Sequence, residues 1–263
     1  MNKSQIAHEG RGQTYDEVYA KYYDILNQHK NYKEETERLE ELITSLSVCN
    51  AVPIIDIGCG TGCHAINLSE MRANPISGFD TSNAMINEAK SKGSSVDFFC
   101  GEISHIRSEK YGFAFSLFNV INCIKAFDDL ARFFSSLNRI LKPGSYFFFE
   151  FWNKDLVTAS PPTTVIRQFS HGDKEFIRTA EPDNSKLSSG ELKLLYNIEI
   201  VSCNGEKGRF SRTHDLALHS FNEIEGCLQN KGFQINSHRG SLPELSLSTS
   251  NARMTSVLAK KTG

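Results

Sequence analysis

Three glycines at alternating positions, just after an acidic residue, form the segment with the clearest chemical character. An apolar, β-branched stretch leads into Asp56, then Gly58, Gly60 and Gly62, and a helical apolar pattern follows. Glycine has no Cβ, so the backbone of such a turn can pass close to a bound molecule. The N-terminus of the next helix offers unpaired N–H groups and the positive end of a dipole. This order of strand, turn and helix is typical of a nucleotide-cofactor site in a doubly wound α/β fold.

The spacing of the turn distinguishes between nucleotide cofactors. A dinucleotide fingerprint reads G-x-G-x-x-G and holds a pyrophosphate, but Cys63 stands where its third glycine belongs. Asp56 would also repel a pyrophosphate, whereas it suits a cofactor with a cationic or amine end. Nicotinamide-dependent oxidoreduction is therefore the less favoured hypothesis. A second acid, Asp80, follows about 20 residues later, where an acid that binds ribose is expected.

Composition excludes several classes of function. The chain has 263 residues and a net charge of -2, with no lysine- or arginine-rich run, so no footprint for nucleic acid is visible. Its start lacks the apolar region of a signal peptide, and no apolar stretch approaches the roughly 18 residues of a transmembrane helix. Seven scattered cysteines favour reduced thiols over disulfides or zinc. We expect a cytoplasmic protein that binds a small molecule, with no metal, membrane or nucleic acid.

Hydrophobic patterns divide the chain into four parts. Residues 1–50 are expected to form two helices that act as a lid, and residues 51–155 alternate between short strands and helices, which predicts a parallel, Rossmann-like core. Residues 156–219 alternate with period two around a turn at 204–208, which predicts an antiparallel β insert after strand five. Residues 220–263 begin with a capping box at Ser220 and Glu223 and supply a helix and the last two strands.

These motifs resemble those of the class I S-adenosylmethionine (SAM) methyltransferases. D-x-G-x-G-x-G over 56–62 looks like their motif I, and segments 78–80, 101–103 and 141–144 are similar to their later motifs. Together with the tyrosine-rich start and the insert, they resemble one branch of the class. That branch includes sugar-nucleotide N,N-dimethyltransferases and small-molecule methyltransferases of polysaccharide gene clusters. The resemblance implies SAM as cofactor and a doubly wound, seven-stranded α/β sheet whose last strand is antiparallel.

The resemblance also implies which residues bind the cofactor. The glycine turn would contact the methionine part of SAM, Asp56 would hold its amino group, and Asp80 would accept hydrogen bonds from both ribose hydroxyls. Tyrosines of the lid would approach the sulfonium, where an aromatic face is favourable, although helix packing also explains them. The residues expected at SAM are Tyr15, Tyr23, Asp56, Gly58, Cys59, Gly60, Asp80, Thr81, Met85, Glu102, Ile103, Phe118 and Asn119.

Fewer residues are candidates for the acceptor side. Methyl transfer mainly requires a nucleophile about 3 Å from the activated methyl, and a hydroxyl acceptor needs a base whereas a neutral amine does not. The catalytic candidates are His214, His219 and Tyr15, although both histidines could instead be hydrogen-bonded or surface residues. Cys123 stands where macrolide-sugar enzymes carry a histidine, and a guanidinium could bind an anionic group. The residues expected at the acceptor are Tyr22, Cys123, Trp152, Arg178 and Arg253.

The sequence thus predicts a SAM-dependent methyltransferase that acts on a nucleotide-activated sugar or a capsule precursor. Methylation of an oxygen, in a sugar or a phosphoramidate-type group, and of an amino-sugar nitrogen both remain open. The alternative is a SAM-binding regulatory or partner subunit without turnover, which an acceptor pocket plugged by side chains would favour. A monomer and a homodimer also remain open.

Overall fold

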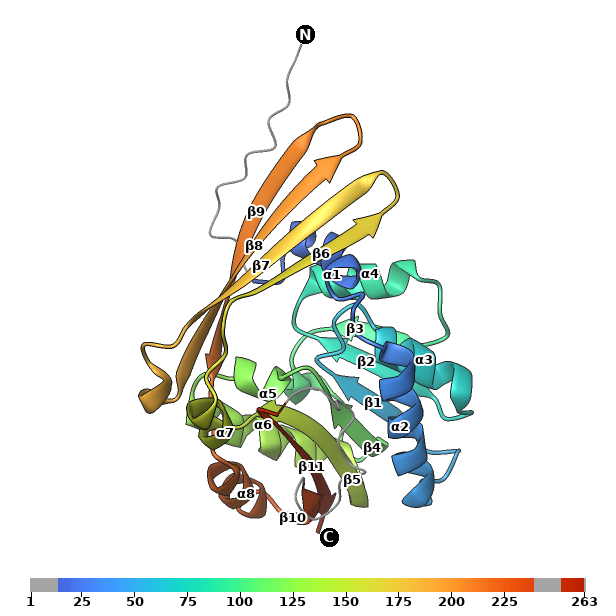
Figure 1. Cartoon of the computed structure of the whole chain (residues 1–263). Helices are drawn as coiled ribbons and strands as arrows, with labels where there is room; N and C mark the ends of the chain where they lie inside the picture. Colours follow the sequence, from blue (N-terminus) through green and yellow to red (C-terminus); the bar gives the residue numbers. More distant parts are fainter. Residues whose placement is uncertain (1–13, 239–251, 263) are drawn as a thin grey trace.

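Two β-sheets form the framework of the protein (Figure 1). The computed structural model describes residues 14–238 and 252–262. The larger sheet contains β1 (Ile54–Ile57), β2 (Ile76–Asp80), β3 (Asp97–Cys100), β4 (Tyr111–Ser116), β5 (Leu141–Trp152), β10 (Phe233–His238) and β11 (Met254–Lys261). The smaller, insert sheet contains β6 (Val165–His171), β7 (Lys174–Asp183), β8 (Glu191–Ser202) and β9 (Lys207–Ala217).

The topology of the larger sheet confirms the predicted fold class. Its strand order is β10-β11-β5-β4-β1-β2-β3. The strands from β5 to β3 pair in parallel, whereas β11 is antiparallel to both β5 and β10. The insert sheet is antiparallel throughout, in the order β6-β7-β8-β9. Parallel strands place their carboxyl ends on one edge, where an open α/β sheet binds its ligands.

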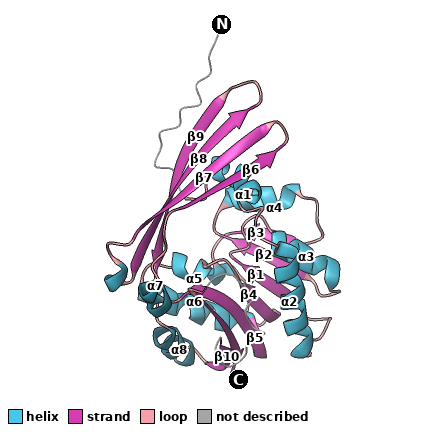
Figure 2. Ribbon diagram, viewed as in Figure 1, coloured by secondary structure: helices cyan, strands magenta, loops and turns pink. Residues whose placement is uncertain are grey.

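Helices cover both faces of the larger sheet (Figure 2). One face packs against α2 (Tyr32–Ser45), α3 (Cys63–Met71) and α4 (Asn83–Ser91), and the other against α6 (Phe127–Ile140) and α8 (Phe221–Gln229). The aromatic strand β5 serves both faces, because successive side chains of a strand point to opposite sides. Phe147, Phe149 and Phe151 stack toward α6 and α8, while Phe148 packs on the other side.

The first helix, α1 (Glu17–Leu26), is held between the core and the insert sheet (Figure 1). On the core side, Asp24 forms an ion pair with Lys92 at 2.7 Å and accepts a hydrogen bond from Thr61 in the glycine turn. On the insert side, the helix cap Asp16 pairs with Arg212 of β9. These contacts keep α1 over the carboxyl edge of the sheet. In contrast, α2 packs on α3 as part of the core.

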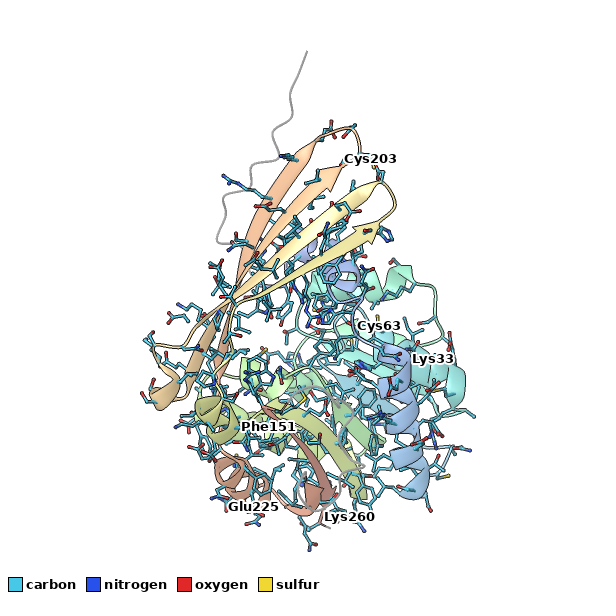
Figure 3. The ribbon with its side chains drawn as sticks, in the orientation of Figure 1. Lys33, Cys63, Phe151, Cys203, Glu225 and Lys260 are labelled. Carbon is cyan, nitrogen blue, oxygen red and sulfur yellow. The ribbon has the colours of Figure 1, made fainter. Side chains whose placement is uncertain are left out.

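Short elements near the sheet edge were not predicted. They are the helices α5 (Val120–Cys123) and α7 (Lys154–Ala159) and the 3-10 turns η1 (Ile103–His105) and η2 (Leu187–Ser189). Each is too short for a hydrophobic period to be recognised. All seven cysteines are free thiols, and Figure 3 shows Cys203 at the tip of the insert, far from Cys63 near the glycine turn. Among the described residues, no helix has both the length and the apolar character needed to cross a membrane.

Candidate active site

The glycine turn between β1 and α3 is held by the end of β2. The carbonyl oxygen of Phe79 accepts from the amides of Gly58 and Cys59 at 2.7 and 2.9 Å. Asp80 Oδ2 accepts from the amide of Gly60 at 2.9 Å, and Oδ1 accepts from the amide of Ser82 at 2.8 Å. The turn and the second acid are therefore one unit, although 20 residues separate Gly60 from Asp80 in the sequence.

Gly58 cannot carry a side chain without displacing the segment after β4. Its φ is +74°, and an added Cβ would lie 2.4 Å from a methyl carbon of Val120. We expect Gly58→Ala to lower the free energy of unfolding by about 2 kcal/mol more than Gly93→Ala. Gly93 is a matched control because its φ is +67° and no atom lies within 4 Å of its added Cβ. Urea denaturation of both variants measures the difference, and equal losses would refute the clash.

A cavity of about 630 Å³ lies along the carboxyl edge of the sheet, over the glycine turn. Its walls come from the turn, the ends of β2 and β4, α1, η1 and α6. Asp80, Glu102 and Asp129 supply its carboxylates. Met85, Ile103 and Phe133 supply apolar surface. Of the residues predicted to bind the cofactor, those that line this cavity are Tyr15, Tyr23, Gly58, Gly60, Asp80, Thr81, Met85, Glu102, Ile103 and Phe118.

Asp56 faces a much smaller space behind the turn. This cavity of about 30 Å³ is also lined by Gly58, Cys59 and Gly60. Asp56 is buried, and its Oδ2 atom has no hydrogen-bond partner within the described residues. Burial raises the pKa of this carboxyl group well above its usual range, and the nearby charge of Asp80 raises it further. A buried acceptor without a partner is costly, so the site suits a ligand that brings a donor with positive charge.

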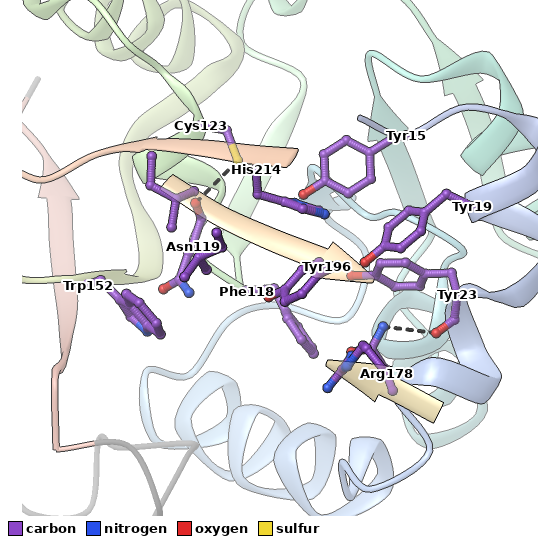
Figure 4. Close-up of a pocket in the computed structure, with 13 residues that line it drawn as sticks. Tyr15, Tyr19, Tyr23, Phe118, Asn119, Cys123, Trp152, Arg178, Tyr196 and His214 are labelled. Carbon is purple, nitrogen blue, oxygen red and sulfur yellow. Dashed lines mark hydrogen bonds between the residues drawn. The ribbon is translucent and has the colours of Figure 1, made fainter. Parts of the chain in front are cut away.

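A second pocket, of about 100 Å³, continues from the large cavity toward the insert sheet (Figure 4). Four residues line both spaces: Tyr15, Tyr23, Phe118 and Cys123. Tyrosines of α1 lie on one side of the pocket and Asn119 and Trp152 on the other. The pocket contains several polar groups, but no carboxylate is among the described residues that line it.

The junction between the two spaces is built on strained backbone. Phe118 and Asn119 follow β4 with φ values of +64° and +61°. Residues other than glycine rarely adopt this left-handed backbone conformation. The ring of Phe118 stacks on Tyr32 and lies beneath the ammonium group of Lys30, with 2.9 Å from Nζ to the ring centroid. Strain of this kind persists where the surrounding structure imposes it and gathers at functional sites.

His214 of β9 lies among aromatic rings in the small pocket. Its ring centroid is 4.6 Å from that of Tyr196, 5.2 Å from Tyr15 and 5.4 Å from Tyr19. Nε2 is buried and has no partner in the described structure. Burial, followed by the charge of Arg178, lowers the pKa of His214 to about 4. The imidazole is therefore neutral at pH 7, and one of its ring nitrogens carries a free lone pair.

A third cavity, of about 530 Å³, opens beyond the small pocket between the start of α2 and the insert sheet. Arg178, Arg253 and Trp152 line it, together with Lys30 and Arg167, which the sequence did not single out. The wall shared by the small pocket and this cavity is formed by Asn27, Phe118, Asn119, Trp152, Arg178, Leu194 and Tyr196.

Residues 54–144 match the family model described as a methyltransferase domain. This segment holds the glycine turn, Asp56, Asp80 and the junction after β4. The chain carries a class I SAM-dependent methyltransferase domain. It is accordingly a methyltransferase enzyme, and SAM is its cofactor.

The chain is similar to known methyltransferases in sequence and in fold. Over 223 residues it is 26% identical to putative methyltransferase YqeM of Bacillus subtilis (strain 168). The aligned region covers 82% of this chain and 85% of YqeM. It is 24% identical over 141 residues to dTDP-3-amino-3,4,6-trideoxy-alpha-D-glucopyranose N,N-dimethyltransferase of Streptomyces venezuelae, covering 52% of this chain and 59% of that protein. The structure of SAM-bound CalS10, an amino pentose methyltransferase from Micromonospora echinaspora, superposes with a TM-score of 0.72 at 15% identity, covering 96% and 100%.

We expect SAM binding to release a proton from Asp56. An ammonium group beside this buried carboxylate favours its charged form, so its raised pKa falls when the cofactor binds. The bound state then holds fewer protons, and SAM affinity rises with pH by at most about tenfold per unit. Calorimetry in two buffers of different ionisation enthalpy measures the release, which Asp56→Asn should abolish. Equal heats in both buffers would contradict this role.

The structure brings most predicted site residues together and leaves two outside. Tyr22 lines none of the four cavities and packs instead against Phe176 and Phe210 of the insert. His219 also lies outside these cavities. Its ring is beside Phe127, and its backbone forms an isolated β-bridge with Asn153. Tyr19 was missed, although it stands four residues before Tyr23, a spacing that places both side chains on one face of α1.

Proposed function

We propose that the enzyme transfers a methyl group from SAM to an oxygen or nitrogen atom of a small polar acceptor. We infer that this acceptor is a sugar-like molecule, such as a nucleotide-activated sugar or a precursor of a surface polysaccharide. The observation that carries the proposal is the shared lining of Tyr15, Tyr23, Phe118 and Cys123. It makes the small pocket continuous with the cofactor cavity. A nucleophile in this pocket would therefore face the cofactor.

The chemistry of the small pocket supports a polar acceptor. Asn119 Oδ1 and His214 Nε2 are buried and lack hydrogen-bond partners within the described residues. Buried polar groups normally find partners, and an acceptor with several hydroxyl or amine groups would provide them. The names of two similar proteins, an amino-sugar dimethyltransferase and an amino pentose methyltransferase, agree with this chemistry.

His214 is the residue we assign to proton removal. SAM supplies a methyl group that is already activated, so the protein must mainly place the acceptor and receive a proton. His214 is neutral at pH 7, and burial raises the pKa values of Tyr15 and Tyr19, which keeps both hydroxyls protonated as donors. The tyrosines therefore orient the acceptor, while His214 Nε2 accepts its proton.

Incubation with SAM and a panel of acceptors tests the proposal. The panel contains free sugars, sugar phosphates and nucleotide sugars, each with hydroxyl and amino members, and mass spectrometry detects the gain of one methylene group. Formation of such a product supports the proposed function. No product from any member, with SAM binding intact, would refute it. Because the small pocket is not plugged by side chains, the geometry does not favour a subunit without turnover.

A further inference from the structure

The 530 Å³ cavity contains a buried guanidinium group that no carboxylate among the described residues neutralises. Arg178 is 7% exposed, and the described residues contribute no ion pair to it. Nη1 donates to the amide oxygen of Asn27 at 3.2 Å, and the rings of Phe169 and Tyr196 lie near the group. Nε has no partner within the described structure. Buried charges are normally paired, so Arg178 indicates an anion supplied from outside the chain.

A second arginine stands opposite Arg178 in the insert sheet. In the register of β6 and β7, Arg167 is the cross-strand partner of Arg178, and both residues line the same cavity. Like charges in this arrangement repel one another. An anion between them would remove the repulsion. Trp152 adds a third donor, because its buried Nε1 has no partner in the described part of the chain and can only donate.

The carboxylates of this cavity are bonded to other residues. Glu34 pairs with Arg38, and Glu35 bonds both His64 and Lys30. Glu150 accepts from the hydroxyl of Ser256 at 2.9 Å.

A neighbouring histidine reflects the positive surroundings. The pKa of His29, which lines the same cavity, is lowered to about 4, first by burial and then by the charges of Arg167, Arg178 and Lys30. The charges that lower this pKa belong to three cations of the cavity, and Glu35 opposes them.

We propose that this cavity is a phosphate-binding subsite in which Arg178, Arg167 and Trp152 anchor a phosphorylated acceptor. The inference rests on the proposed function, because the shared wall of the two spaces lets one molecule reach from the subsite into the small pocket. Guanidinium groups match the paired oxygens of phosphate. The phosphate of a sugar monophosphate and the diphosphate of a nucleotide share this chemistry.

Calorimetry on the enzyme saturated with S-adenosylhomocysteine tests the subsite. The probes are glucose 1-phosphate, inorganic pyrophosphate and uridine diphosphate. We expect at least one to bind, and we expect Arg178→Gln and Arg167→Gln each to weaken that binding roughly tenfold or more. Tighter binding of uridine diphosphate than of pyrophosphate would indicate that the bound phosphate belongs to a nucleotide. Equal binding of the two would indicate that the subsite recognises the phosphate groups alone. Either result supports the subsite.

Two controls keep the test decisive. Arg209→Gln removes an exposed charge from the same insert sheet outside the cavity and should leave probe binding unchanged. Unchanged affinity for S-adenosylhomocysteine shows that each variant is folded, and the exposed Arg167 gives a second variant should Arg178→Gln fail to fold. Absence of binding by every probe, or wild-type binding by Arg167→Gln and Arg178→Gln, would overturn the subsite. Methylation of uncharged sugars would still leave the proposed function standing, whereas probe binding without any methyl transfer would refute that function alone.

Discussion

Asp80→Ala is expected to weaken SAM binding by roughly 100- to 1000-fold, because hydrogen bonds to a charged group contribute about 1.5–3 kcal/mol each. The substitution removes an anion that faces the large cavity, where we expect it to accept from the ribose hydroxyls. It also removes the acceptor for the amides of Gly60 and Ser82. The glycine turn would then lose its link to β2. Titration calorimetry with SAM and with S-adenosylhomocysteine measures the loss.

Two further variants separate charge from damage to the fold. Asp80→Asn keeps the size of the side chain but loses the charge, so its affinity should lie between those of the wild type and Asp80→Ala. Asp97→Ala removes an exposed carboxylate from the neighbouring strand β3 and should leave affinity unchanged. The ribose-binding role of Asp80 would be disproved if the affinity of Asp80→Ala for SAM stayed within roughly threefold of the wild-type value, as is expected for Asp97→Ala.

The parts of the cavity that the sequence could predict are local. Asp56, the three glycines and Asp80 stand at fixed intervals that one strand–turn–helix unit and the next strand impose. The turn lies within one such unit, and Asp80 ends the next strand, β2, which pairs with β1. The alternation of strand and helix patterns likewise fixes the order of the elements, which is why the seven-stranded sheet was predictable.

Contacts between distant segments could not be predicted in the same way. Asp16 and Arg212 are 196 residues apart, yet their ion pair holds α1 against the insert. Tyr196 belongs to a period-two strand, and its pattern shows only that one face is covered, not that α1 and His214 cover it. Phe118 and Asn119 have left-handed backbone without a glycine to mark it. The ring of Phe118 packs against Lys30 and against Tyr32, the first residue of α2, and no pattern in the sequence links that region to the segment after β4.

His214→Gln is expected to lower kcat by roughly 100- to 10,000-fold if the acceptor is a hydroxyl, because general-base catalysis contributes about that much. A neutral amine acceptor loses its proton without such help, so the same variant should then change kcat by less than about tenfold. The size of the effect therefore distinguishes O-methylation from N-methylation. SAM affinity should remain unchanged, since His214 does not line the cofactor cavity.

The pH profile provides an independent measurement of the same group. With a pKa of about 4, His214 is deprotonated above pH 5 and the wild-type rate should be flat from there to neutrality; it should fall as the ring gains a proton near pH 4. His219→Gln is the matched control, because His219 also has a buried, unpartnered Nε2 within the described residues but lies outside the pocket. Equal losses of kcat in the two variants would indicate a structural effect of removing a buried imidazole, whereas a loss confined to His214→Gln assigns the proton to that ring.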